Sequence, residues 1–152
     1  MTPFKIAALN GYVELCNLLI DEIDNADLKC KDETAPFLMA ATNGHLEVCR
    51  TIMETIQDKN PADIYGRTPL RFAARNGNWN ICRMIIEKVD NKNPSDNDGY
   101  TPLHEAAYFG FLDVCRLIID NLDNIHPLNI YGKTPKDRAK HCGRFAISRL
   151  FD

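Results

Sequence analysis

The chain has 152 residues, which is long enough to bury the core of one domain. Hydrophobic residues make up 45% of it and charged residues 26%, so the composition excludes an intrinsically disordered chain. The formal net charge of −3 argues against a general nucleic-acid-binding protein, because such proteins are usually clearly basic.

Neither membrane insertion nor export is indicated by the sequence. The longest apolar runs are only a few residues, far short of the ~20 residues that a membrane-spanning helix needs. The first residues, MTPFKIAALNG, lack both the basic start and the continuous apolar run of a signal peptide. We therefore expect a cytoplasmic protein, with the nucleus as an alternative, in which the six cysteines stay as thiols.

A period of 33 residues runs through the whole chain. It is shared by cysteines (16, 49, 82, 115), Ala-Ala pairs (7, 40, 73, 106), glycines (11, 44, 77, 110, 143) and prolines (3, 36, 69, 102, 135). Features that keep one register identify a repeat array. We expect a single domain over 1–152, with repeats at about 2–34, 35–67, 68–100 and 101–133 and a C-terminal cap at 134–152.

Within one repeat the predicted elements follow a fixed order. Thr101-Pro102 is a helix start, and the short helix over 103–109 stops at Gly110, which tolerates a positive φ. A second helix begins near Leu112, with apolar residues around most of its circumference. The polar stretch 90–99 carries turn signals at Pro94 and Asp98-Gly99. Each unit therefore reads as helix, tight turn, helix and extended loop, stabilised by stacking on its neighbours.

These residues resemble the ankyrin repeat, whose signature is D-x-x-G-x-T-P-L-H-x-A-A-x-x-G-H-L-E-V-V. The matching stretches are DNDGYTPLHEAAYFGFLDVC (96–115), DIYGRTPLRFAARNGNWNIC (63–82), NIYGKTPKDRAKHCG (129–143) and GHLEVC (44–49). The resemblance covers essentially the whole chain. It implies an all-α repeat solenoid, a slightly curved stack whose loops project as short β-hairpins. It also implies a protein-binding groove formed by the hairpin tips and the first helices.

Two departures from the family pattern concern the loops. Cys30 and Glu33 stand where the family has Asp and Gly, so we expect a distorted hairpin in repeat two. The family's Gly after the second helix is replaced at positions 23, 56, 89 and 122 by Ile, Ile, Val and Leu. We expect that helix end to be capped instead by Asn25, Asn91 or Asn124.

The two ends of the array differ in polarity. Lys136 and Lys140 replace apolar residues of the other units, which predicts a polar C-terminal cap. Repeat one (GYVELCNLLI, 11–20) is as apolar as the internal repeats. We therefore expect the native protein to continue upstream or to have this face covered, and otherwise to be a monomer.

The cysteines indicate packing rather than chemistry. The four periodic cysteines take a second-helix position where the family usually has Val, so we expect buried thiols and no disulfides. Cys30 and Cys142 lie outside the series and should be more accessible. No C-x-x-C or H-x-x-x-H pattern is present, so we predict neither a metal site nor a cofactor.

Other candidate chemistry is also absorbed by the repeat. The resemblance implies that His104 and Thr101 hydrogen-bond in the turn before the first helix, so His104 is not paired with Cys115 as a nucleophile. It implies that Asn60 and Asn93 bond the hairpin backbone, and in some family members that Asn is hydroxylated by an oxygenase. Trp79 takes a position held elsewhere by leucine and is predicted to be in the core. We expect no catalytic activity.

The family's variable positions select the candidate partner contacts, in which tyrosine and arginine recur. They are Ile64, Tyr65, Arg67, Phe72, Arg75 and Asn76 in repeat three; Asn97, Asp98, Tyr100, Glu105, Tyr108 and Phe109 in repeat four; Ile130, Tyr131, Lys133, Arg138 and His141 in repeat five; and Lys31, Asp32, Met39, Thr42 and Asn43 in repeat two. For Tyr65 and Tyr131, packing against the next hairpin is an equal alternative. The predicted function is a non-catalytic scaffold that binds a protein partner.

One alternative follows from a charge asymmetry. Residues 133–149 carry six Lys or Arg against Asp137, a formal +5, which leaves −8 for the rest of the chain. This basic end is either a solvated cap or a docking patch for acidic ligands, including nucleic acid or phospholipid. A further alternative is a recruiting or regulatory segment of a larger enzyme, channel or effector protein.

Overall fold

The computed structural model of the protein describes residues 1–22 and 34–152, and these residues contain helices and loops but no β-strand. The helices are α1 (Pro3–Asn10), α2 (Val13–Glu22), α3 (Thr34–Asn43), α4 (Leu46–Thr55), α5 (Pro69–Arg75), α6 (Trp79–Ile86), α7 (Pro102–Phe109), α8 (Leu112–Ile119), α9 (Pro135–His141), α10 (Phe145–Ser148) and the 3-10 helix η2 (Arg149–Phe151). The predictions for Ile23, Asn25, Cys30, Lys31, Asp32 and Glu33 lie outside the described residues.

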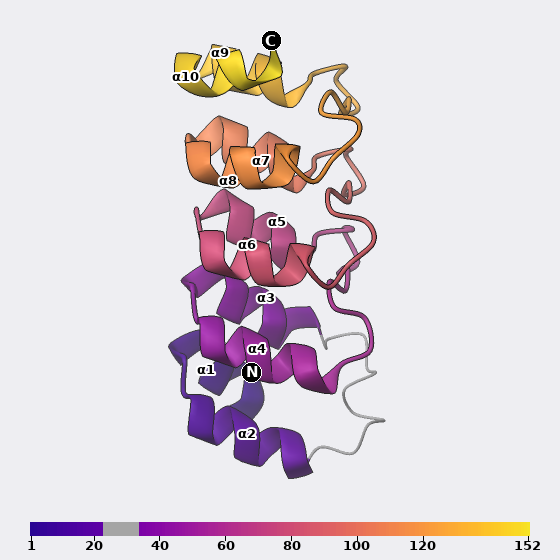
Figure 1. Cartoon of the computed structure of the whole chain (residues 1–152). Helices are drawn as coiled ribbons and strands as arrows, with labels where there is room; N and C mark the ends of the chain where they lie inside the picture. Colours follow the sequence, from indigo (N-terminus) through magenta and orange to yellow (C-terminus); the bar gives the residue numbers. More distant parts are fainter. Residues whose placement is uncertain (23–33) are drawn as a thin grey trace.

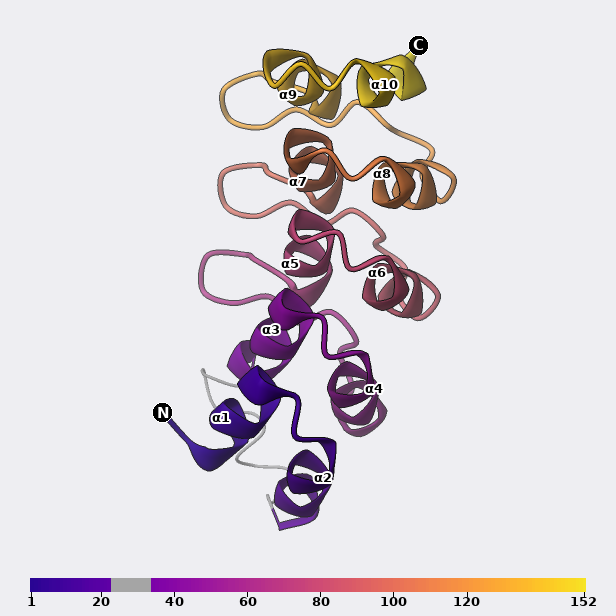
Figure 2. The same ribbon diagram turned by 90° about the vertical axis from the view of Figure 1, so that its left-hand side faces the viewer.

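The helices form a stack of antiparallel pairs (Figure 1). Figure 2 shows two columns: α1, α3, α5, α7 and α9 form the first-helix column, and α2, α4, α6, α8 and α10 form the second-helix column. Each helix contacts its pair mate and the equivalent helices of the adjacent pairs, and the two chain termini lie toward opposite ends of the stack. The predicted all-α repeat solenoid is confirmed.

The first helix of each repeat begins and ends at the residues that the sequence indicates. The hydroxyls of Thr68, Thr101 and Thr134 accept the backbone N–H three residues on, at 3.3, 3.3 and 3.1 Å, and each is followed by proline. Gly110 ends α7 with a φ of 95°. A Cβ at Gly110 would meet only the Arg144 side chain, which can shift, so this glycine is needed for its backbone angle.

The core is built from the periodic small residues. The Ala-Ala pairs at 7, 40, 73 and 106 are fully buried between the columns, and so are Cys16, Cys49, Cys82 and Cys115. All four cysteines are free thiols. Burial raises the pKa of Cys49, Cys82 and Cys115 to about 12, so these thiols stay protonated and unreactive at neutral pH. The predicted packing role of the cysteine series is confirmed.

Lysines cap the second helices α4 and α6, and the predicted asparagine caps are wrong for Asn91 and Asn124. Lys92 Nζ donates to the carbonyls of Ile86 and Val89, each at 2.7 Å, and Lys59 bonds the equivalent carbonyls at the end of α4. Asn91 instead accepts the N–H of Asn93 at 3.2 Å and closes a local turn, as Asn124 does for residue 126. A lysine ammonium group both bonds the last carbonyls and complements the negative helix end.

Trp79 lies on the surface, so its predicted place in the core is wrong. The indole is 37% exposed on the outer side of α6, with the guanidinium of Arg83 lying 5.6 Å from the ring centroid. Leu46 and Leu112 at the equivalent position are themselves only half-buried. The position therefore lies at the rim of the second-helix column, where a leucine fits and the larger indole projects outward.

The loops before the first helices project to one side of the stack; we call residues 63–67, 96–100 and 129–133 the finger loops (Figure 2). Each closes as a tight turn, for example with the Asp96 N–H donating to the Tyr100 carbonyl at 2.9 Å. Neighbouring loops are joined by one backbone hydrogen bond each, from the Asn97 N–H to the Tyr65 carbonyl and from the Ile130 N–H to the Asp98 carbonyl, both 3.0 Å. The Asn97 side-chain amide also donates to the Ile64 carbonyl at 3.2 Å. The predicted hairpins are therefore turns without regular strands in this part of the chain.

The two ends of the stack differ as the sequence indicates. Leu15 in α2 is 41% exposed, whereas Val48, at the equivalent position in α4, is fully buried because α4 packs on α2. The expectation that an upstream segment or another cover lies on this face of α2 stays a prediction. At the other end, the Lys136 ammonium group pairs with the Asp152 carboxylate in a polar cap. Over the described residues we find no helix with the length and apolarity that crossing a membrane demands.

Candidate functional site

Six of the predicted contact residues form a continuous strip on the first-helix column and finger loops. We call this set the arginine–aromatic strip: Arg75, Tyr100, Tyr108, Phe109, Tyr131 and Arg138. They come from α5, α7, α9 and two finger loops. The stack therefore brings together residues that are up to 63 positions apart in the sequence.

The strip is held by cation–π and edge-to-face contacts. The Arg75 guanidinium carbon lies 5.0 Å from the Phe109 ring centroid, and Phe109 meets Tyr108 edge-to-face at 5.0 Å. The Arg138 guanidinium carbon lies 4.1 Å from the Tyr108 centroid and 4.9 Å from that of Tyr100. Contacts of this kind fix the orientation of both the rings and the guanidinium groups.

The repeat register explains this arrangement. Residues 33 positions apart are stacked on one another, so Arg75 at the end of α5 faces the end of α7, where Tyr108 and Phe109 lie. Tyr100 immediately precedes the Thr101 cap of α7, and its ring contacts that of Tyr131 in the next finger loop at 6.5 Å. This contact supports the alternative that Tyr131 packs in part against its neighbour, although its ring stays exposed.

A second, smaller cluster surrounds Arg67 in repeat three. Its guanidinium carbon lies 4.7 Å from the Tyr65 centroid and 5.5 Å from that of Phe72, and Nη2 is 2.7 Å from the Asp63 carboxylate. Burial acts to raise the pKa of Asp63, but hydrogen bonds from Arg67 and from the Tyr65 N–H outweigh it and lower that pKa. Arg67 therefore already has an internal partner.

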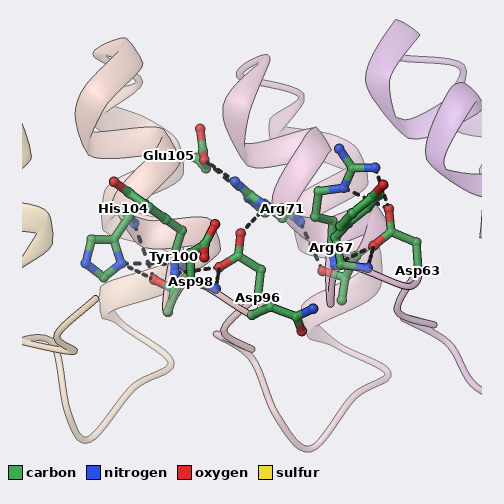
Figure 3. A network of polar contacts seen from close by, with 12 residues as sticks. Asp63, Arg67, Arg71, Asp96, Asp98, Tyr100, His104 and Glu105 are labelled. Atoms are coloured by element: carbon green, nitrogen blue, oxygen red, sulfur yellow. Dashed lines mark hydrogen bonds and ion pairs between the residues drawn. The ribbon is translucent and has the colours of Figure 1, made fainter. Parts of the chain in front are cut away.

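The prediction that Glu105 contacts a partner is wrong, because its carboxylate belongs to a buried ion network (Figure 3). Arg71 lies between an acid of the next finger loop and an acid of α7, with Nη1 on the Asp96 carboxylate and Nη2 2.8 Å from Glu105 Oε1. The side chains of Arg71, Asp96 and Glu105 are only 13%, 6% and 5% exposed. Glu105 therefore joins repeats three and four instead of facing solvent.

Arg71 is not among the residues that the sequence predicts for the site. The sequence nevertheless marks this residue, because Arg71 replaces the histidine of the T-P-L-H motif. Repeat four keeps that histidine as His104. An arginine at a position that the stack buries requires acidic partners nearby. The 33-residue register places Asp96 in the next finger loop and Glu105 in α7, where the Arg71 side chain can reach both.

His104 has the structural role that the resemblance implies. Its Nδ1 accepts the Thr101 N–H at 3.2 Å and lies 2.9 Å from the Thr101 hydroxyl, while Nε2 lies 3.0 Å from the Lys133 carbonyl. Because Nδ1 accepts, the proton of the neutral ring is on Nε2, which donates a hydrogen bond to the Lys133 carbonyl. Burial lowers the pKa of His104, so the ring is neutral and both nitrogens are occupied. It is therefore not available as a base for Cys115.

Asn60 and Asn93 also have structural roles. Their Oδ1 atoms accept the backbone N–H of Leu70 at 2.9 Å and of Leu103 at 3.0 Å, in the first turns of α5 and α7. The expected partner is therefore corrected: each asparagine bonds the start of a first helix and not the hairpin backbone. Hydroxylation at these positions stays a prediction.

The remaining predicted residues lie around the strip. Ile64, Asn97, Asp98, Ile130 and Lys133 are exposed in the finger loops. Asn76 ends α5, with its amide on the Phe72 carbonyl at 2.9 Å, and in repeat two Met39 and Thr42 are half-buried while Asn43 is exposed. His141 and Lys133 line an open cavity of about 500 Å³ together with Asp137, Arg138 and Lys140.

No group of three or more metal-binding side chains occurs among residues 1–22 and 34–152. The polar residues of the site instead belong to internal networks or to the strip surface. The strip presents aromatic rings beside fixed guanidinium groups. These residue types are enriched at protein–protein interfaces.

Comparison with known families agrees with this architecture. A family model described as ankyrin repeats (three copies) matches residues 4–96 and 52–131. Comparison with curated proteins finds no match to this chain. Ankyrin repeats generally serve as protein–protein interaction modules and are typically non-catalytic. Because the two matches cover most of the chain and the helix pairs stack in a 33-residue register, the chain belongs to the ankyrin repeat family.

Proposed function

We propose that this protein is a non-catalytic scaffold that captures a protein partner across the arginine–aromatic strip of repeats three to five. The observation that carries this proposal is the unbroken series of contacts from Arg75 through Phe109, Tyr108 and Arg138 to Tyr100. Tyrosine and arginine side chains are over-represented among the residues that dominate binding energy at interfaces.

The rigidity of the strip supports the proposal. Each aromatic ring is held by an arginine or another ring before any partner arrives, and the helices beneath are fixed by the buried alanine and cysteine series. Little side-chain entropy is then lost on binding, since these side chains are already ordered. We further propose that the protein acts in the cytoplasm as a monomer.

The test replaces Tyr100, Tyr108 and Phe109 together by alanine. Truncating residues at the centre of an interface costs ≥ ~2 kcal/mol each where they are hot spots, so partner capture should be abolished. Immobilised wild-type and variant proteins are compared by affinity capture from the source organism and quantitative mass spectrometry. Circular dichroism and thermal unfolding establish that the variant is folded.

A matched control removes aromatic area elsewhere. Trp79 in α6 and Phe145 in α10 are exposed aromatic residues outside the strip. The Trp79→Ala/Phe145→Ala variant should retain every partner that the wild type captures. Unchanged capture by the folded triple variant would refute the strip as the binding surface.

The charge of the C-terminal repeat suggests one alternative, attachment to nucleic acid or phospholipid. Such binding would weaken steeply with salt, and reversing the charges of Lys136 and Lys140 would abolish it. Capture that persists at 0.5 M salt and in that charge-reversal variant excludes this alternative. A role as the recruiting segment of a larger enzyme, channel or effector is compatible with the same strip.

A further inference from the structure

Arg138 is the one strip residue placed between two tyrosines. Its guanidinium carbon lies 4.9 Å from the Tyr100 ring centroid and 4.1 Å from that of Tyr108. It forms no ion pair within the part of the chain that the structure describes, and its Nε atom is buried without a hydrogen-bond partner. A buried N–H donor that lacks an acceptor costs free energy that a bound acceptor would recover.

The space beside Arg138 is open and positively charged. A cavity of about 500 Å³ is lined by Lys133, Asp137, Arg138, Lys140 and His141, in which three cations face one acid. The Asp137 carboxylate is already engaged, because it accepts the Thr134 N–H and hydroxyl, both at 2.9 Å. These bonds, and then the charges of Lys133 and Lys140, lower its pKa.

The acid at the equivalent position of the preceding repeat is engaged as well, since Glu105 is bound by Arg71 at 2.8 Å. Neither of these carboxylates therefore satisfies the Arg138 guanidinium, which stays oriented by the two tyrosines. An arginine held in this way offers the planar fork that pairs with a carboxylate through two parallel hydrogen bonds.

We propose that Arg138 receives a carboxylate side chain, Asp or Glu, from the bound segment of the partner protein, with Lys133 and Lys140 providing the surrounding positive field. This inference rests on the proposed function and specifies the chemistry of its partner. The field of this cavity attracts any anion, because three cations face one acid. The site is assigned to a carboxylate because Asp and Glu are the anionic side chains that a protein partner carries without modification, and phosphate is the competing probe in the experiment.

The experiment titrates the full chain with three probes at equal pH and ionic strength: acetyl-tetraglutamate-amide, acetyl-tetraglutamine-amide and inorganic phosphate. The readout is the ¹H–¹⁵N signal of Arg138 Nε, which burial should protect from exchange with water. The signal is assigned from its loss in Arg138→Lys. We expect the glutamate peptide to shift it saturably at lower concentration than phosphate, and the glutamine peptide to leave it unchanged.

Variants then test the role of the guanidinium through the shifts of the backbone amides of α9. Arg138→Gln should weaken glutamate-peptide binding at least about tenfold, because a charged bidentate contact is lost. Arg138→Lys keeps the charge without the planar fork and should weaken it less, and this variant decides the matter if Arg138→Gln does not fold. Arg116→Gln removes the same charge from the outer helix α8 and should leave binding unchanged.

Each contrary outcome overturns the assignment. The carboxylate site is refuted if no saturable shift occurs, if Arg138→Gln binds as the wild type does, or if phosphate binds more tightly than the glutamate peptide. These results leave the proposed function standing when the triple alanine variant still loses its partner. Conversely, peptide binding at Arg138 together with unchanged capture by the triple variant refutes the strip and retains the anion site.

Discussion

The junction between repeats three and four and the junction between repeats four and five lie in the same register but contain different charges. At the first, Arg71 is enclosed by Asp96 and Glu105, and all three side chains are nearly buried. One cation is shared by two acids, so the charged groups of this junction satisfy one another (Figure 3). The first junction is closed to outside ligands.

At the second junction each of these three residues is replaced. His104 takes the position of Arg71, Asn129 that of Asp96, and Arg138 that of Glu105. His104 is neutral and reaches only the Lys133 carbonyl across the junction, at 3.0 Å. The Asn129 amide nitrogen and the Arg138 Nε are both buried without a partner. The second junction is therefore left with unsatisfied donors.

This difference separates the stabilising role of a register position from its binding role. The same three positions hold repeats together when their charges are complementary, and they present donors to a ligand when they are not. Substitutions that alter one junction at a time test this separation.

Removing the cation of the closed junction should have the largest effect. Arg71→Met leaves two buried carboxylates, Asp96 and Glu105, without a counter-ion. Breaking a buried pair by removing one partner costs about 3–5 kcal/mol, so the free energy of unfolding should fall by that amount. Urea denaturation followed by circular dichroism measures it.

The control is an exposed pair of similar geometry. Arg83 Nε lies 2.8 Å from Glu87 Oε1, but both side chains are more than half exposed, at 57% and 55%. Arg83→Met should therefore cost less than about 1 kcal/mol. Equal losses in the two variants would contradict the distinction between a buried and a solvated pair.

Converting the open junction into a closed one should have the next largest effect. In His104→Arg, a buried cation is introduced without acids. Adding Asn129→Asp and Arg138→Glu reproduces the network of the first junction and should recover about 1–3 kcal/mol relative to the single substitution. Calorimetric unfolding of the single, double and triple variants measures this coupling. Additive effects across the series would show that the register does not bring these positions together.

The periodic features were predictable from the sequence because each depends on its own repeat. Thr101 caps α7 and Gly110 ends it with a positive φ, and Cys115 is buried at the position that its series indicates. These outcomes follow from local backbone geometry and from the small volume that stacked helices leave between them. The family pattern contains both constraints.

Side chains that reach across a junction were not predictable in the same way. The variable position of Glu105 predicts a surface residue, but the Arg71 side chain from the preceding repeat covers it. The leucines at the position of Trp79 predict burial, but they are only half-buried in the structure. The destination of a long or large side chain depends on its neighbours in space, which the repeat pattern does not specify.

Acid should destabilise the second junction through His104. Burial lowers the pKa of His104 in the folded protein, while an unfolded histidine titrates near 6.5. Above pH 6.5 its stabilising contribution is complete; below it the unfolded chain binds a proton that the folded chain does not, so the free energy of unfolding falls. In urea titrations at pH 7.5 and 5.5, His104→Gln should show a smaller fall than the wild type. An identical fall in both proteins would contradict this assignment.

The smallest expected effect concerns the segment that enters each junction. Lys92 bonds the Ile86 and Val89 carbonyls before the first junction, whereas Ile125 holds the equivalent position before the second and packs against the core. Lys92→Met removes the cap and should cost about 0.5–1 kcal/mol, because a cation at a helix C-terminus contributes in this range. Hydrogen exchange should become faster at the last turn of α6 and stay unchanged in α8, where no lysine cap exists to be lost. Faster exchange in both helices would mean that Lys92 stabilises the whole stack and not the end of one helix.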